Sequence, residues 1–90
     1  MFASIVVVSI DEPDAEEGRR MLEEDIVPNV SAAPGFVSGY WLAPVGNEGT
    51  AVVIFDTEEQ ARATAPPVGA NPGPGVTVTS LEFREVVASA

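Results

Sequence analysis

The hydrophobic pattern of residues 2–10 predicts a central β-strand. Their sequence, Phe-Ala-Ser-Ile-Val-Val-Val-Ser-Ile, is β-branched and apolar at both odd and even positions. A strand with one face in water alternates between apolar and polar residues, whereas this pattern suits a strand that is covered on both faces. Residues 50–55, Thr-Ala-Val-Val-Ile-Phe, repeat the pattern and predict a second central strand.

The next segment, from Asp14 to about residue 33, has the pattern of an amphipathic helix. Asp14 and Glu17 form a helix-start signature three residues apart. Pro28 removes a backbone donor and predicts a kink or a break, and Pro34-Gly35 ends the helix. Apolar residues at steps of three and four form a stripe that we expect to lie on the sheet: Ala15, Gly18, Leu22, Ile26 and Val30.

The rest of the chain predicts two further strands and a short helix. Residues 36–43 read as a strand, in which strict alternation places Phe36, Ser38, Tyr40 and Leu42 on one face and Val37, Gly39, Trp41 and Ala43 on the other. Residues 44–49 supply a hairpin turn. Thr57 and Gln60 predict a capping box for a helix to about Ala65 whose inward side is only Ala61 and Ala65. The Pro/Gly-rich residues 66–75 form either a lid or a passive connector before a last strand, 76–87.

This order, β-α-β-β-α-β, predicts one α+β domain over residues 1–90 with a ferredoxin-like fold. Right-handed crossovers would put both helices on one face of a four-stranded antiparallel sheet, with the first and third strands in the middle. The helix-free face would cover about 440 Å², from four strands at ~4.8 Å spacing and seven residues at ~3.3 Å. Because this area matches the largest apolar patch of a typical monomer, we expect a homodimer.

Composition excludes several classes of function. The formal net charge of −10 disfavours nucleic acid and anionic membranes as partners. The chain has no Cys, His or Lys, which removes thiolate and imidazole chemistry, Schiff bases and the usual ligands of zinc and haem, so we expect no metal and no cofactor. There is no apolar run of about 18 residues and no basic segment before the first apolar stretch, so we expect a soluble, cytoplasmic protein.

Three motifs resemble the dimeric α/β-barrel superfamily, in particular its antibiotic-biosynthesis monooxygenase-like members. They are Pro34-Gly35-Phe36, Gly39-Tyr40-Trp41-Leu42 and Phe55-Asp56-Thr57-Glu58-Glu59. The resemblance covers nearly the whole chain and implies two sheets packed face to face as a barrel, with a small-molecule cavity between each sheet and its helices. The family's haem-degrading members carry an Asn on strand one, a Trp on strand three and an axial His. This chain instead has Ser4 and Ser9 on strand one and Phe55 on strand three, so haem degradation is not expected.

Three residues are candidates for a ligand pocket: Tyr40, Trp41 and Arg84. The single Trp, Trp41, is either a ligand wall or a packed side chain at an interface or under a helix. The Tyr40 hydroxyl either donates a hydrogen bond to a substrate or, if the side chain is only packed, bonds to another group of the protein. Arg84, between Glu82 and Glu85, either holds a carboxylate or polarises a carbonyl, or lies at an exposed strand end or in an interchain ion pair. The catalytic residues, if the chain is an enzyme, are not identified by the sequence.

The leading hypothesis is a homodimeric α/β-barrel protein that binds either a small apolar or aromatic ligand or no ligand. The first alternative is a cofactor-independent monooxygenase or isomerase acting on an aromatic or polyketide-like substrate, in which Tyr40, Trp41 and Arg84 would be tested. The second alternative is a structural dimerisation module.

Overall fold

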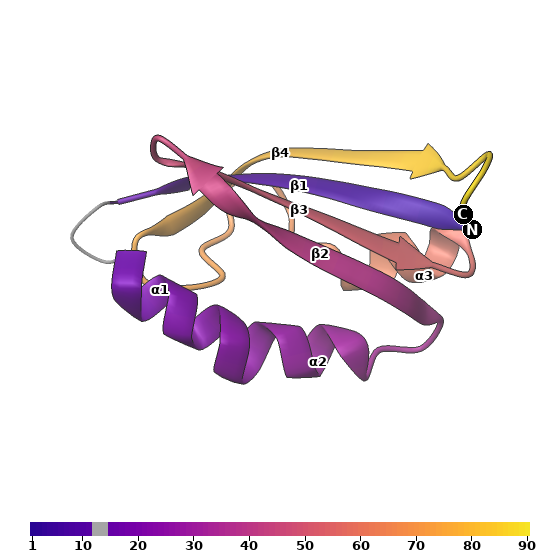
Figure 1. Ribbon diagram of the computed structural model, residues 1–90, viewed down its shortest axis with the longest axis horizontal. Coiled ribbons are helices and arrows are strands. Elements are labelled where there is room, and N and C mark those ends of the chain that lie inside the picture. The colour runs from indigo at the N-terminus through magenta and orange to yellow at the C-terminus, as the bar shows by residue number, and fades with distance from the viewer. Residues whose placement is uncertain (12–14) are drawn as a thin grey trace.

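A computed structural model describes residues 1–11 and 15–90 as a four-stranded antiparallel sheet with helices on one side (Figure 1). The strands are β1 (Phe2–Ile10), β2 (Phe36–Val45), β3 (Glu48–Phe55) and β4 (Val76–Glu85). The helical segments are α1 (Ala15–Met21), the π-helical turn η2 (Leu22–Ile26), α2 (Val27–Ser31) and α3 (Glu58–Thr64). The predicted helix start at Asp14 lies outside the described residues.

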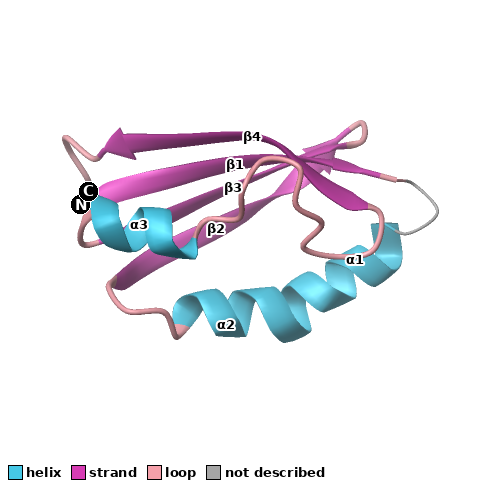
Figure 2. Cartoon of the chain, turned by 180° about the vertical axis from the view of Figure 1, so that it is seen from behind, coloured by secondary structure: helices cyan, strands magenta, loops and turns pink. Residues whose placement is uncertain are grey.

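The strand order is β2-β3-β1-β4, which confirms that β1 and β3 are central. Both strands are apolar at both parities, although helices cover only one face of the sheet (Figure 2). The arrangement is α+β and is compatible with a ferredoxin-like fold. Within one chain the sheet is open, with β2 and β4 as its edges, so the chain alone does not close a barrel.

The register assigns the side chains of the central strands to two faces. The helices cover one face of the sheet (Figure 2). On that face Ser4 lies opposite Val53, and Val6 lies opposite Ala51. The next residues along each strand, including Ile5 and Val52, point to the helix-free face. The sheet therefore has one face under helices and one face without them. The helix-free face is apolar on the central strands, whereas β4 contributes Ser80, Glu82 and Arg84 to it.

The predicted face of Phe36 was wrong, because β2 contains a bulge. Phe36 pairs with Phe55, but Ser38 pairs with Ile54, so two steps along β2 match one step along β3. The bulge turns Phe36 to the helical side, where its ring packs edge-on against Phe55 with the centroids 6.2 Å apart. Strict alternation had placed Phe36 beside Tyr40 on the opposite face.

The long helical segment continues through Pro28 without the predicted break. The π turn lies immediately before it, and the Val27 N–H donates to the Leu22 carbonyl, five residues back. Proline lacks an N–H and crowds the carbonyl four residues earlier, so a widened turn is one way for a helix to accommodate it. The helical path thus continues from Ala15 to Ser31.

The short helix α3 covers the other end of the sheet. The Thr57 Oγ1 accepts a hydrogen bond from the Gln60 N–H at 3.2 Å, which confirms the N-cap half of the predicted capping box. The reciprocal half is not formed, because the Gln60 Oε1 is buried with no hydrogen-bond partner among the described residues. Ala61 is fully buried in the core cluster with Val53 and Phe55. On the outer side, the Arg62 guanidinium lies 4.3 Å from the centroid of the Phe83 ring. None of the described helices has the length and apolar character needed to cross a membrane.

The Pro34-Gly35-Phe36 motif forms the turn that enters β2. Gly35 has φ +81°, and the side-chain amide of Gln60 occupies the space that a Cβ at this position would need. The Gly35 carbonyl also accepts a hydrogen bond from the Asp56 N–H at 2.9 Å. The glycine therefore ties the entry of β2 to the start of α3.

Gly35→Ala should lower the free energy of unfolding by about 2–3 kcal/mol, because it combines a left-handed backbone penalty with displacement of Gln60. Gly46→Ala is the matched control, because Gly46 has φ +63° with no heavy atom within 4 Å of the new Cβ. It should cost only about 1 kcal/mol. Urea unfolding of both variants measures the difference, and equal losses would contradict the contact with Gln60.

Candidate functional site: a cavity between the sheet and the long helix

A cavity of about 700 Å³ lies between the helical side of the sheet and the segment α1-η2-α2. This volume is within the range of about 300–1,000 Å³ that small-molecule sites occupy. Most of its lining side chains are apolar and come from every strand and from the long helical segment, among them Val6, Val8, Ile10, Leu22, Ile26, Val27, Val30, Trp41, Ala51, Val53, Phe55 and Val76. A smaller hollow, of about 380 Å³, is lined only by residues of the β2–β3 hairpin and lacks a second wall.

The cavity exists because the helical segment contacts the rest of the fold near its two ends. At one end, a Cβ added to Gly18 would lie 3.4 Å from Val76 Cγ2, so α1 passes close to the start of β4. At the other end, Val30 and Ala33 pack against the core cluster. Between these ends, Leu22 and Ile26 line the cavity together with three small residues of the sheet, Ala43, Gly49 and Ala51. Of the predicted stripe, Gly18, Leu22, Ile26 and Val30 face the sheet side and line the cavity, and Leu22 and Ile26 border its open middle. The side chain of Ala15 lies outside the described residues.

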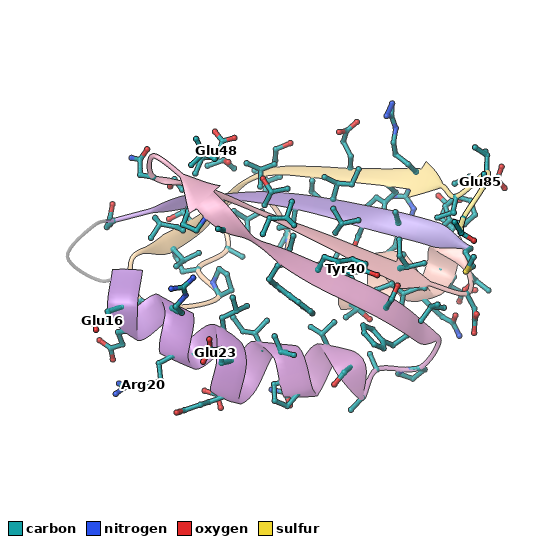
Figure 3. The ribbon with its side chains drawn as sticks, in the orientation of Figure 1. Glu16, Arg20, Glu23, Tyr40, Glu48 and Glu85 are labelled. Atoms are coloured by element: carbon teal, nitrogen blue, oxygen red, sulfur yellow. The ribbon has the colours of Figure 1, made fainter. Side chains whose placement is uncertain are left out.

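The lining residues differ in exposure, which distinguishes a floor from a mouth. The least exposed are on the central strands: Phe55 at 1%, Ser4 at 2%, Val53 at 6% and Val6 at 8%. The exposed lining residues come from the helix and from the end of β2: Glu16, Arg19, Glu23, Leu42, Ala43 and Pro44. The cavity therefore opens between the helical segment and the edge strand β2, where Figure 3 shows Glu16 and Glu23 along the helix.

The segment after α3 forms a further wall. Thr64, Ala65, Pro66, Pro72 and Gly73 line the cavity. The loop is bonded to β4, because the Gly69 N–H donates to the Val78 carbonyl at 2.8 Å and the Val78 N–H donates to the Ala70 carbonyl at 2.9 Å. These bonds hold the Pro/Gly-rich loop against the sheet beside the cavity.

Trp41 is the one of the three predicted pocket residues that lines this cavity. Its Cζ3 and Cη2 atoms lie 2.8 and 2.9 Å from the place where a Gly39 Cβ would be, so the indole covers the bare backbone of Gly39. The ring also packs against the core cluster. Trp41 is therefore both a packed side chain and a cavity wall.

Tyr40 and Arg84 lie on the helix-free face. Tyr40 neighbours Trp41 on β2, points the other way and is 61% exposed (Figure 3). Arg84 is exposed and pairs with Ala3, whereas its neighbour Phe83 packs toward the core. The two are on opposite edges of the sheet, about 14 Å apart at three strand spacings of ~4.8 Å. The structure thus separates these two from Trp41.

Ser4 is a lining residue that the candidate set from the sequence did not include. Its hydroxyl is on the cavity floor and lies 3.5 Å from the Val53 carbonyl oxygen. The signal was present, because Ser4 interrupts an apolar run at the same parity as Val6 and Val8. Two further lining residues carry hydroxyls. The Thr64 hydroxyl donates to the Gln60 carbonyl at 3.2 Å. Thr50 pairs with Val7, so its side chain is directed to the helix-free face. Over residues 1–11 and 15–90, no group of three or more metal-ligating side chains is brought together.

Comparisons with protein-family models, with curated proteins and with solved structures gave no match for this chain.

Gly39→Ala should displace the Trp41 indole, because the new Cβ would overlap the ring. We expect a red-shifted Trp41 emission maximum and a loss of about 1–2 kcal/mol in the free energy of unfolding. Gly73→Ala is the control, because its Cβ would meet no heavy atom within 4 Å. An unchanged emission maximum in Gly39→Ala would contradict the stacked position of the indole.

Proposed function

We propose that this chain binds a small, neutral, apolar or aromatic molecule in the cavity between the sheet and the long helix. The observation that carries the proposal is a space of about 700 Å³ with a mainly apolar lining and an indole in its wall. Apolar pockets of this size with a few polar groups are the usual form of small-molecule sites.

Charge favours a neutral ligand. The charged lining residues of the described chain are two glutamates and one arginine, all at the mouth. The chain carries a formal net charge of −10, which repels anions at long range. A cation would be attracted to the surface, but it would lose its hydration inside an apolar interior.

The expected affinity is moderate. A ligand of about 15 non-hydrogen atoms that gains about 0.4 kcal/mol per atom would bind with roughly 6 kcal/mol, which corresponds to a dissociation constant of tens of micromolar. Such binding is measurable through the emission of Trp41, because the ligand would contact the only indole of the chain.

Titration with neutral aromatic compounds should change Trp41 emission in a saturable way. Ala51→Leu should weaken binding at least about tenfold, because Ala51 lies opposite Val6 and Trp41 and a larger side chain there would fill the cavity. Ala63→Leu, on the exposed side of α3, is the matched control and should bind as the original chain does. Loss of binding in both variants, or in neither, would argue against this cavity as the site.

The helix-free face supports a second proposal, that two copies pair through it. This face carries Ile5, Val7, Val52 and Ile54 from the central strands, and Tyr40 and Leu42 from β2 are 61% and 54% exposed. Apolar side chains on a contiguous face of this size favour burial against a partner. Two open sheets packed in this way would form the barrel that the sequence resemblance implies, with Tyr40 and Arg84 on the paired face.

Sedimentation equilibrium should show a dimer at micromolar concentration. Tyr40→Glu should shift the equilibrium toward monomer by at least about tenfold, because it places a charge on the helix-free face at a residue that does not line the cavity. Val68→Glu, at a 61% exposed loop position, should leave it unchanged. A compact monomer at high protein concentration would refute the pairing.

Catalysis by a cofactor-independent monooxygenase or isomerase is the less favoured use of the same cavity. The arrangement that supports it is an indole and a buried hydroxyl, those of Trp41 and Ser4, in one apolar chamber. Tyr40 and Arg84, the other residues considered for catalysis, are on the opposite face of the sheet. The residues of the cavity lining that could act as a general acid or base are at its mouth, away from Ser4 and Trp41, so binding is favoured over catalysis.

A further inference from the structure

Ser4 stands apart from the rest of the cavity floor. It is the buried polar residue of the described chain, at 2% exposure, and its floor neighbours Val6, Val53 and Phe55 are all apolar. Burying a hydroxyl among apolar groups is unfavourable unless the hydroxyl makes a good hydrogen bond.

The hydrogen bond that Ser4 makes is weak. Its oxygen lies 3.5 Å from the Val53 carbonyl oxygen, whereas hydroxyl bonds to oxygen are usually 2.7–2.8 Å long. The carbonyls of a central strand also serve the ladder between strands, so Val53 has little need of this donor. The Ser4 proton can therefore be redirected toward a better acceptor at little cost.

Two other residues with hydroxyls border the cavity, Thr50 and Thr64. Thr50 pairs with Val7, which directs its side chain to the helix-free face. The Thr64 hydroxyl is more firmly engaged than that of Ser4. Thr64 donates to the Gln60 carbonyl, four residues back along its own helix, at 3.2 Å. Ser4 is thus the interior hydroxyl with the most to gain from a ligand atom, and it is placed where the deepest part of a ligand would lie.

We infer that the preferred ligand carries a carbonyl oxygen at its buried end, and that the Ser4 hydroxyl donates a hydrogen bond to it. The ligand class is then a neutral, mainly apolar ketone, with its hydrocarbon part against Trp41 and the aliphatic walls. This inference rests on the proposed binding function and adds to it the polarity and orientation of the ligand.

The test uses two probes of nearly equal shape, tetralin and 1-tetralone, which differ by one carbonyl oxygen. Calorimetric dissociation constants would be measured for the original chain, for Ser4→Ala and for Ser9→Ala. Ser9 is on the same strand but at the opposite parity, and it does not line the cavity, so Ser9→Ala is a matched control. We expect the preference for tetralone over tetralin to fall about fivefold in Ser4→Ala and to stay within about twofold in Ser9→Ala.

The outcomes separate the inference from the function on which it rests. If tetralin and tetralone both fail to bind the original chain, the proposed function itself fails. If both bind but Ser4→Ala keeps the original preference, binding stands and the role of Ser4 is overturned. The corresponding alcohol, 1-tetralol, provides a third comparison. A preference for it over tetralone that depends on Ser4 would mean that Ser4 accepts rather than donates, which would also overturn the inference.

Discussion

The support of one helical segment near its two ends is the constraint on which the rest of this structure depends. At one end α1 passes close to β4, where a Cβ on Gly18 would lie 3.4 Å from Val76 Cγ2, while Val30 and Ala33 pack on the core at the other end. A segment held only at its middle could tilt onto the sheet and close the space beneath it. Held near both ends, it leaves room wherever the sheet presents small residues, and Gly49 and Ala51 are at those positions. The cavity is thus a consequence of where the contacts are made.

The π turn belongs to the same arrangement. Leu22 and Ile26, its first and last residues, both line the cavity, and Pro28 follows two residues later. A wide turn relieves the crowding that proline causes, but it gives up regular hydrogen bonding in the part of the helix with least support from the sheet. The stability of this segment therefore depends on its ends. A ligand beneath it would supply apolar contacts that the sheet does not.

Local patterns predicted much of the fold, and non-local register limited the rest. Residues 2–10 and 50–55 are apolar at both odd and even positions, which identified the central strands, and Thr57 identified a helix cap. Both features depend on residues that are close in the sequence. The face of Phe36 could not be obtained in this way, since a bulge is defined by the partner strand. The cavity was equally hidden. Its small residues are visible in the sequence, but their position beneath Leu22 and Ile26 depends on how far the helix stands from the sheet.

In the candidate site, too, residue types could be read from the sequence, whereas the positions of the side chains could not. The sequence drew attention to Tyr40, Trp41 and Arg84 because they are the residue types that bind ligands, yet alternation along β2 sends Tyr40 and Trp41 to opposite faces. Ser4 drew no attention as a ligand partner because one hydroxyl in an apolar strand has many explanations. Its position decides between them. A hydroxyl that is 2% exposed, borders a cavity and has only a 3.5 Å contact with a backbone carbonyl gains little from the fold itself. The Ser4 hydroxyl is therefore better explained by a hydrogen bond to a bound ligand than by a contribution to the stability of the strand.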